Sequence, residues 1–520
     1  RVQELLQYRH VAGTATAFAG VRELRPGHAL TLDLDTGAET IACYWDAPSR
    51  PSRRIGHEKV HPAGPIGDLL ASSVKDQLVS DVPLGTQLSG GLDSSLISAL
   101  AVRERQDPMH TFSIGFPGAV EDESRWAGAV AARLGTIHHP IAYSEREFLE
   151  EFAFCAWHND EPISYPNSVP MYKLCRTARQ HVTVLLTGEG ADELFGGYSW
   201  QRRMWRLRRL GLVDPRGMLR PLVRRLVAKG HGEDVAALLD KSPRGMAVDA
   251  SKWITDRRME TLLSPELPGQ EPSLREILPV SEVDPLAAVL DLDIRTYLVS
   301  VLRRQDRMSM AAGVEVRVPF LDHNLVEAVA RIPVSELFQG GRGKALLRKI
   351  ARGLVPDAVI DRPKIGFRVP VAEWMRHERS LGRLLGWLYD ERARERKLWQ
   401  ADALKMLVED HWHGRADHSE TLWSFLSMEI WARLWMDGVT HEQLKEQILE
   451  GVPAEQPCDR KRGGRSPGLR ICHVVPSLEV GGMERVVCDL VGGLDRSGHR
   501  CSLFCTDTEG ALYAGAAVVA

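Results

Sequence analysis

The strongest chemical signal in this sequence is the loop at residues 89–95, which reads SGGLDSS. It lies between a predicted strand at 84–88 and a predicted helix at 94–105. Two adjacent glycines allow a tight turn that brings backbone N–H groups close to a ligand. The helix N-terminus adds partial positive charge. We expect this loop to cradle a pyrophosphate group, although a plain capped strand–helix turn is the alternative.

A second loop, residues 187–193, reads TGEGADE and follows a buried apolar run at 182–187. Because ligands of open α/β sheets bind beyond the carboxyl ends of the strands, Asp93 and Asp192 could converge there from two strands. Two carboxylates beside a phosphate chain suit Mg²⁺, which takes its other ligands from phosphate and water. Glu189 remains free to transfer a proton or to hold an attacking amine. The alternative is a cluster of acidic residues that caps a helix.

The elements that must position these loops alternate between strand and helix. Strand patterns at 84–88, 109–116, 136–143 and 182–187 are interleaved with helical patterns, and residues 200–440 are mostly helical. Such alternation predicts an α/β fold with a doubly wound parallel sheet, followed by a mainly helical region. The first 46 residues show only short patterns, with strands predicted at 29–34 and 40–45 and turns beside them. Further helices are expected at 66–80, 94–105 and 124–134.

Composition narrows the class of protein. The chain has 520 residues and a formal net charge of -3, so nothing requires a nucleic acid or an anionic membrane as partner. No apolar run is long enough to span a membrane, and a cytoplasmic location is expected.

The eight cysteines are scattered and predict reduced thiols. The pairs His138–His139 and His411–His413 lack a ligand set around them, which predicts surface or strand-end residues. The basic segment 202–209 predicts a solvated helix face.

Both loops, together with four further segments, resemble the synthetase domain of the glutamine-hydrolysing asparagine synthetase family. The resemblance extends over about residues 60–440 and implies a sheet of the ATP-pyrophosphatase, or adenine nucleotide alpha hydrolase-like, type. The further segments are RMSM at 307–310, EVRVPFLD at 315–322, GKALLR at 343–348 and RPKIGF at 362–367.

The resemblance also implies roles for individual residues. ATP and Mg²⁺ are the expected substrate and cofactor, with Asp93 and Asp192 as the metal ligands. The residues expected to bind ATP are Leu88, Ser89, Gly90, Gly91, Asp93, Ser94, Ile114 and Gly188.

Two residues are expected to act in catalysis. Glu189 matches the acid/base residue of the family, and Lys364 matches a lysine that stabilises the adenylation transition state. A positioned ammonium is most effective there, because negative charge builds on the departing pyrophosphate. Arg317 and Asp322 either contact the substrate or only shape the pocket wall.

The resemblance divides the chain into four parts. Residues 1–48 resemble the end of an N-terminal-nucleophile glutaminase domain, and 57–440 the ATP-pyrophosphatase domain. Residues 441–468 are a linker. Residues 469–520, with a strand predicted at 471–475 and a helix at 483–494, resemble the start of a family-four glycosyltransferase. Because Arg1 stands where that glutaminase carries its cysteine, this chain is expected to use ammonia and not glutamine.

Three functions remain open from the sequence. The first is asparagine synthesis from aspartate, ATP and ammonia, with glutamine as the nitrogen source in the intact family. The second keeps the adenylation and changes the acceptor: a β-lactam or lasso-peptide cyclase, or amidation of a sugar acid. β-Lactam synthetases pair a tyrosine with the catalytic glutamate, and no clear counterpart is found here. The third is a non-catalytic binding module, against which the intact carboxylates and Lys364 argue. A homodimer is one expectation for the assembly.

Overall fold

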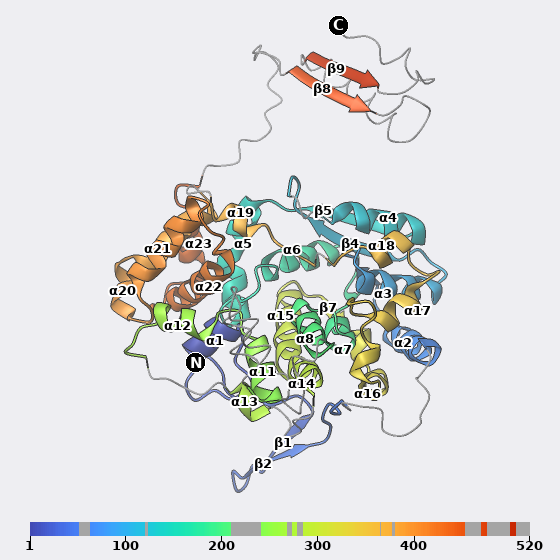
Figure 1. Cartoon of the computed structure of the whole chain (residues 1–520), viewed down its shortest axis with the longest axis horizontal. Coiled ribbons are helices and arrows are strands. Elements are labelled where there is room, and N and C mark those ends of the chain that lie inside the picture. Colours follow the sequence, from blue (N-terminus) through green and yellow to red (C-terminus); the bar gives the residue numbers. More distant parts are fainter. Residues whose placement is uncertain are drawn as a thin grey trace. The chain divides into compact units, whose positions relative to one another are not determined.

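The computed structural model describes two compact units, Arg1–Pro453 and Ala454–Ala520 (Figure 1). The structure describes residues 1–50, 63–119, 123–209, 241–267, 273–277, 284–364, 366–376, 380–452, 470–475 and 500–505.

The centre of the first unit is a five-stranded parallel sheet in the order β5-β4-β3-β6-β7. This confirms the predicted α/β class and doubly wound parallel sheet. The first strand of the sheet in sequence, β3, pairs with both β4 and β6, so the strand order reverses between β3 and β6. That reversal is the topological switch point at which ligands of such sheets bind. The strands are β3 (Leu84–Gln87), β4 (His110–Gly115), β5 (Ile137–Ala142), β6 (Val184–Leu186) and β7 (Glu315–Arg317).

The central strands are buried on both faces, as parallel strands covered by helices are. In β6, Val184 and Leu186 belong to one hydrophobic core and Leu185 belongs to the other. The first core is built with α2 (Ala63–Gln77), α3 (Leu92–Arg103), α4 (Ser124–Leu134), α16 (His323–Ala330) and α17 (Ala345–Ala351). The second is built with α5 (Glu145–Asn159), α6 (Ser168–Ala178), α15 (Leu298–Met310) and α22 (Ser419–Trp435).

The region after β6 is mainly helical, as predicted, except for β7. Three residues with one apolar side chain are too few to show a strand period, so β7 escapes detection in the sequence. The other helices here are α7 (Ala191–Phe195), α8 (Ser199–Arg209), α11 (Pro243–Ala250), α12 (Asp256–Leu262), α13 (Leu274–Ile277), α14 (Pro285–Leu292), α18 (Asp357–Asp361), α19 (Val371–Trp374), α20 (Glu391–Arg396), α21 (Ala401–Trp412) and α23 (His441–Leu449). A π-helical turn at Asp293–Tyr297 and short 3₁₀ segments at Pro319–Leu321, Val334–Glu336 and Leu381–Tyr389 connect them.

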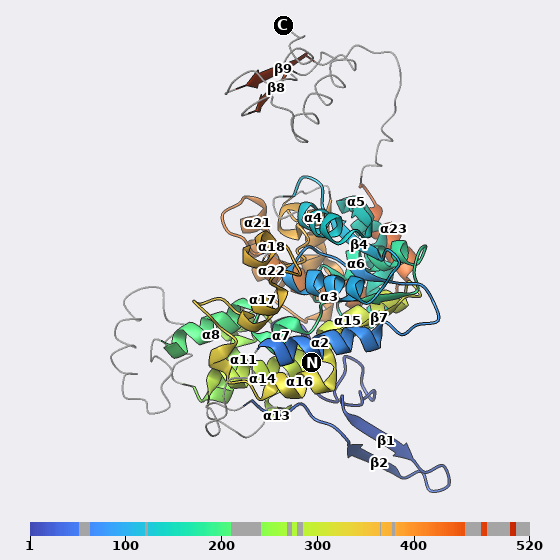
Figure 2. The same cartoon turned by 90° about the vertical axis from the view of Figure 1, so that its right-hand side faces the viewer.

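The N-terminal segment differs in part from expectation. Residues Val2–Tyr8 form a helix, α1, whose Leu5 and Leu6 are buried in the second core, where the sequence predicts only strands and turns. The two predicted strands are present as an antiparallel hairpin of β1 (His28–Leu32) and β2 (Glu39–Cys43). The hairpin projects from the unit and is largely exposed (Figure 2). The glutaminase-like origin of residues 1–48 stays a prediction.

The second unit contains a parallel pair, β8 (Arg470–Val475) and β9 (Arg500–Cys505). The predicted strand at 471–475 is therefore present. The helix predicted at 483–494 and most of the linker predicted at 441–468 lie outside the described residues. Among the described helices, none has the length and apolar character needed to cross a membrane.

Candidate active site

The first glycine loop turns sharply between β3 and α3. Gly90 has φ +72°, a backbone conformation that side chains disfavour. A Cβ atom at Gly90 would also lie 2.4 Å from the backbone nitrogen of Ala127. Gly91 is the N-cap residue of α3. Because glycine has no side chain, it cannot accept hydrogen bonds from the first backbone N–H groups of this helix.

Side chains on both sides of the loop hold its shape. The hydroxyls of Ser89 and Ser94 lie 3.0 Å apart, and Ser94 Oγ accepts a hydrogen bond from the Ser89 N–H at 3.2 Å. Arg362 donates to the carbonyl of Gly90 at 2.9 Å and forms an ion pair with Glu123. The Arg-Pro-Lys segment is thereby anchored against the loop.

The second loop contacts the first. A Cβ atom at Gly188 would lie 2.7 Å from the backbone nitrogen of Ser94 and 2.9 Å from the carbonyl carbon of Asp93. Any side chain at position 188 would therefore push the two loops apart. Because β3 and β6 are neighbours at the switch point, the two loops meet at one edge of the sheet, as the sequence predicts.

A network of two lysines and two carboxylates joins the loops. Lys344 Nζ lies 2.5 Å from Asp93 Oδ2 and 2.6 Å from Asp192 Oδ1. Lys364 Nζ lies 2.7 Å from Asp192 Oδ2. The structure thus brings together Asp93, Asp192 and Lys364, and it adds Lys344.

Lys344 had no role predicted from the sequence. It is only 5% exposed and adopts a left-handed backbone conformation, φ +59°, which is uncommon for a residue with a side chain. Its N–H donates to the carbonyl of Phe195, at the end of α7, at 3.0 Å. Local strain of this kind persists where surrounding contacts enforce it and gathers at functional sites. A single lysine in a sequence carries no sign of such burial.

The charges of this network determine its protonation. Burial and the charge of Asp192 raise the pKa of Asp93, against the effect of Lys344. Burial opposes ionisation of Asp192 too, but the charges of Lys344 and Lys364 hold its pKa well below the usual range. Burial likewise opposes the charge on Lys344, but the two carboxylates raise its pKa. Asp192 and Lys344 are therefore charged at neutral pH.

The donor set fits a magnesium ion. Asp93 Oδ1 is buried and has no hydrogen-bond partner among the described residues, which leaves one carboxylate oxygen available. Two carboxylates are the hard oxygen ligands that Mg²⁺ takes together with substrate phosphates. Two ammonium groups beside them complement a phosphate chain.

Glu189 lies in a separate ion pair at the same edge. Arg304, on α15 and 8% exposed, donates to Glu189 Oε1 at 2.7 Å and to the side-chain oxygen of Asn167 at 2.8 Å. Asn167 in turn donates to the carbonyl of Phe367 at 3.0 Å. Arg304 was missed because its sequence position, within a helical pattern, gives no sign that it reaches another strand end.

A buried carboxyl group, that of Glu193, holds the tyrosine that lies beside Lys364. Tyr198 donates its hydroxyl to Glu193 Oε1 at 2.7 Å, and Lys364 Nζ lies 4.7 Å from the centre of the Tyr198 ring. Burial, reinforced by the charge of Asp192, raises the pKa of Glu193 to about 8. Glu193 is therefore protonated at neutral pH, and the tyrosine ring offers its negative face to the lysine.

The remaining predicted residues are placed differently. Leu88 is fully buried in the first core, and its N–H is taken by the carbonyl of Phe112 at 2.8 Å, so its side chain offers no open surface. Ile114, near the carboxyl end of β4, is only partly buried. Their contact with a nucleotide stays a prediction.

Arg317 and Asp322 have structural partners. Arg317 donates to the carbonyls of Gln77 and Val79, at 2.6 and 2.7 Å, which ties β7 to the end of α2. Asp322 is the N-cap of α16 and accepts hydrogen bonds from the N–H groups of its first turn. Arg317 and Asp322 were expected either to contact the substrate or only to shape the pocket wall, and these hydrogen bonds support the second interpretation.

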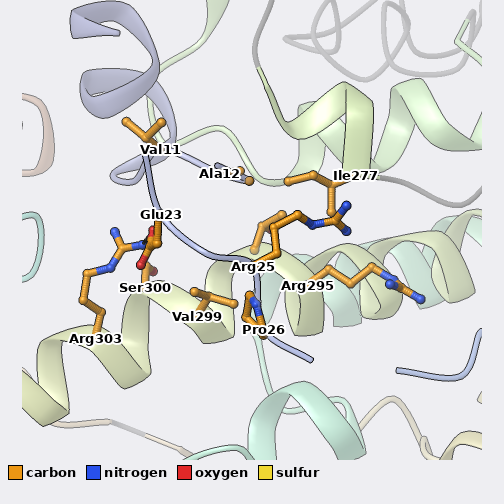
Figure 3. A pocket seen from close by; sticks show the side chains of 12 residues that line it. Val11, Ala12, Glu23, Arg25, Pro26, Ile277, Arg295, Val299, Ser300 and Arg303 are labelled. Atoms are coloured by element: carbon orange, nitrogen blue, oxygen red, sulfur yellow. Dashed lines mark hydrogen bonds and ion pairs between the residues drawn. The ribbon is translucent and has the colours of Figure 1, made fainter. Parts of the chain in front are cut away.

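A pocket lies away from this site, between the N-terminal segment and α15 (Figure 3). Glu23 and Glu161 both pair with Arg303, and Asp46 pairs with Arg295. Two of the three arginines that line the pocket, Arg295 and Arg303, therefore carry compensated charge. The residues that line it are Val11, Ala12, Gly13, Glu23, Arg25, Pro26, Ile277, Arg295, Thr296, Val299, Ser300 and Arg303.

A doubly wound parallel sheet, with two glycine loops and a carboxylate pair at its switch point, defines an α/β protein whose candidate ligand site lies beyond the carboxyl ends of its strands. The asparagine synthase family profile matches residues 66–433. Asparagine synthetase [glutamine-hydrolyzing] 1 of Bacillus subtilis is 31% identical over 442 residues, which is 83% of this chain and 68% of that protein. A putative asparagine synthetase [glutamine-hydrolyzing] of Mycobacterium bovis is 31% identical over 454 residues, 85% of this chain and 68% of that protein. The chain belongs to the asparagine synthase family.

We expect Gly188→Ala to lower nucleotide-dependent activity about 100-fold, with little loss of global stability. The added methyl group must displace the backbone of the first loop, and a small misplacement of reacting groups costs about 100-fold in rate. Steady-state kinetics beside thermal unfolding measures both effects. Gly128→Ala on α4, where a Cβ atom meets nothing within 4 Å, is the matched control. Normal turnover of Gly188→Ala would contradict the close contact of the two loops.

Glu193→Gln should change how stability depends on pH. The pKa of Glu193 is raised from 4.5 to about 8, so the unfolded chain loses this proton first as the pH rises. The stability of the wild-type protein therefore falls between these two values, by about 1.4 kcal/mol per pH unit. Glutamine does not titrate, so the unfolding free energy of the variant does not fall for this reason. The stability of the variant relative to wild type should therefore rise as the pH increases from about 5 to 8. Urea unfolding at both pH values measures it, with the exposed Glu446→Gln as control, and parallel wild-type and Glu193→Gln curves would contradict it.

Proposed function

We propose that this chain is an ATP-dependent, amide-forming ligase that adenylates the side-chain carboxylate of aspartate. Ammonia then attacks the acyl-adenylate, and the products are asparagine, AMP and pyrophosphate. Membership of the asparagine synthase family supports this function. The observation that carries it is the pairing of Asp93 and Asp192 through Lys344 and Lys364, at the edge where two glycine loops meet.

The first step is proposed to use the first loop and both lysines. The uncapped N-terminus of α3 and the hydroxyls of Ser89 and Ser94 bind the phosphate chain. A magnesium ion held by Asp93 and Asp192 would neutralise phosphate charge. Lys364, whose ammonium is less buried than that of Lys344, stabilises the negative charge that develops on the departing pyrophosphate.

The second step is proposed to use Glu189. Its ion pair with Arg304 engages Oε1 and fixes the carboxylate at the sheet edge, and Oε2 is the atom that would accept a hydrogen bond from the incoming amine. The described partner of Glu189 is thus an arginine and not a tyrosine. This arrangement favours an external amine over the intramolecular attack of a β-lactam synthetase, where a tyrosine pairs with the glutamate. A cytoplasmic location and a homodimer remain proposals.

The direct test of this function is ATP–pyrophosphate exchange across a panel of carboxylates, with aspartate, a sugar acid and an N-carboxymethylated amino acid among them. We expect exchange with aspartate, and asparagine formation once ammonium is added. Asp192→Asn should lower exchange at least about 100-fold, because it removes a ligand of the phosphate-bound cation.

Asp322→Asn is the matched control for Asp192→Asn, since asparagine caps a helix as well as aspartate does. Exchange with another carboxylate and none with aspartate would replace the proposed acceptor. No exchange with any carboxylate, in a protein that binds ATP, would exclude the ligase function itself.

Lys364→Ala should slow AMP formation about 100-fold while the Kd for ATP changes by no more than about threefold. The reason is that its charge complements the transition state more than the bound substrate. Rapid-quench measurement of AMP beside equilibrium ATP binding separates the two quantities. The exposed Lys349→Ala on α17 serves as control. Equal losses in both quantities would make Lys364 an ordinary binding residue.

A further inference from the structure

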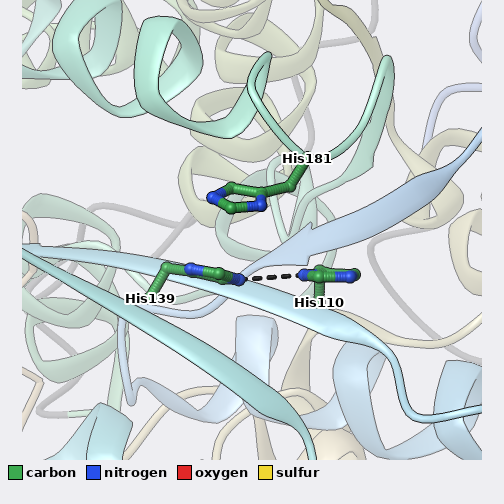
Figure 4. A group of neighbouring side chains, drawn as sticks. All are labelled: His110, His139 and His181. Carbon is green, nitrogen blue, oxygen red and sulfur yellow. Dashed lines mark hydrogen bonds between the residues drawn. The ribbon is translucent and has the colours of Figure 1, made fainter.

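Three histidines gather at a place that the proposed reaction does not use. One ring nitrogen from each of His110, His139 and His181 lies within 4.8 Å of those of the other two. His110 Nδ1 and His139 Nε2 are 2.9 Å apart and face one another, and the His181 ring lies across this pair (Figure 4). His110 opens β4, His139 lies in β5, and His181 stands in the turn between α6 and β6.

The register of the sheet creates the group. Phe112 of β4 pairs with His139 of β5, so His110, Phe112 and His139 project from the same face. His138 projects from the opposite face, where its ring nitrogens contact the hydroxyls of Thr111 and Ser113. The sequence shows no ligand set around His138 and His139, because the histidines that lie near His139 in the structure are 29 and 42 residues away in the chain.

The group lies at the opposite end of the sheet from the proposed active site. His110 is the first residue of β4 and His181 precedes β6, so both stand at the amino ends of their strands. Both glycine loops instead follow the carboxyl ends of β3 and β6. The two places are therefore separate, and a ligand at one need not contact the other.

Stacking of aromatic rings could by itself bring the three histidines together, but it explains only part of their arrangement. His139 stacks on His181 at 4.2 Å and on Phe112 at 4.8 Å between ring centres. Stacking does not account for the contact between His110 Nδ1 and His139 Nε2, which in the metal-free protein is a hydrogen bond between one protonated and one unprotonated ring nitrogen, and a bound ion would replace that proton.

We propose that His110, His139 and His181 bind one divalent transition-metal ion of the zinc type. Three neutral imidazoles are a common ligand set for zinc, and they leave a fourth position open for water or an anion. Imidazole also suits copper and nickel, whereas Mg²⁺ prefers oxygen ligands and would remain at the carboxylate pair. The bound ion would tie the turn before β6 to the neighbouring strands β4 and β5 and stabilise this end of the sheet.

Zinc titration of the whole, chelator-treated chain in excess Mg²⁺ tests the site. A chromophoric zinc indicator as competitor gives stoichiometry and affinity, and Co²⁺ as a substitute gives a visible spectrum that reports nitrogen ligands. We expect one tight equivalent and a rise in the unfolding temperature on zinc addition. His139→Phe and His110→Phe keep an aromatic ring for stacking and remove a ligand nitrogen, so each should weaken zinc binding about tenfold or more.

His138→Ala is the matched control, because it removes a neighbouring histidine from the opposite face and should leave zinc affinity unchanged. The phenylalanine variants should unfold like wild type when no metal is present, which separates loss of a ligand from loss of the fold. Zinc binding that is equal in wild type and both phenylalanine variants would overturn the proposal. So would an equal loss in His138→Ala.

Discussion

The ammonium of Lys344 is the interaction on which the site depends. It lies between Asp93 and Asp192, and these two carboxylates come from loops almost 100 residues apart in the sequence. Without a positive charge between them, two buried carboxylates repel one another and at least one must take up a proton. Lys344 therefore keeps Asp192 charged and opposes the rise in the pKa of Asp93 that burial causes. The strained backbone at Lys344 indicates that the surrounding contacts enforce this position.

Around this charge, the sheet provides the geometry. The order β5-β4-β3-β6-β7 makes β3 and β6 neighbours, so the loops that follow them must meet. The absence of a side chain at Gly188 lets them come into backbone contact. Arg362 then fastens the segment that carries Lys364 to the carbonyl of Gly90. The two glycine loops and the charge network are thus parts of a single packed arrangement.

The helical region completes the site from the other face of the sheet. Arg304 of α15 fixes Glu189, and the adjacent Arg303 pairs with Glu23 of the N-terminal segment. One helix therefore contacts both the proposed acid/base residue and the segment that precedes the sheet. The three-histidine group, at the amino ends of the strands, lies outside this network and would act on stability without touching the reacting groups.

The sequence by itself determined the class of fold and the positions of most strands of the sheet and of the helices between them. It also determined the two loops that carry Asp93, Asp192 and Glu189. These features follow from local periodicity and from glycine-rich turns, which are short-range properties of the chain. Only the tertiary structure decided the roles of Lys344 and Arg304, the structural partners of Arg317 and Asp322, and the helix α1. It also decided the meeting of His110, His139 and His181. Each of these depends on contacts between residues far apart in the chain, and the type of a charged residue does not reveal which distant partner will compensate its burial.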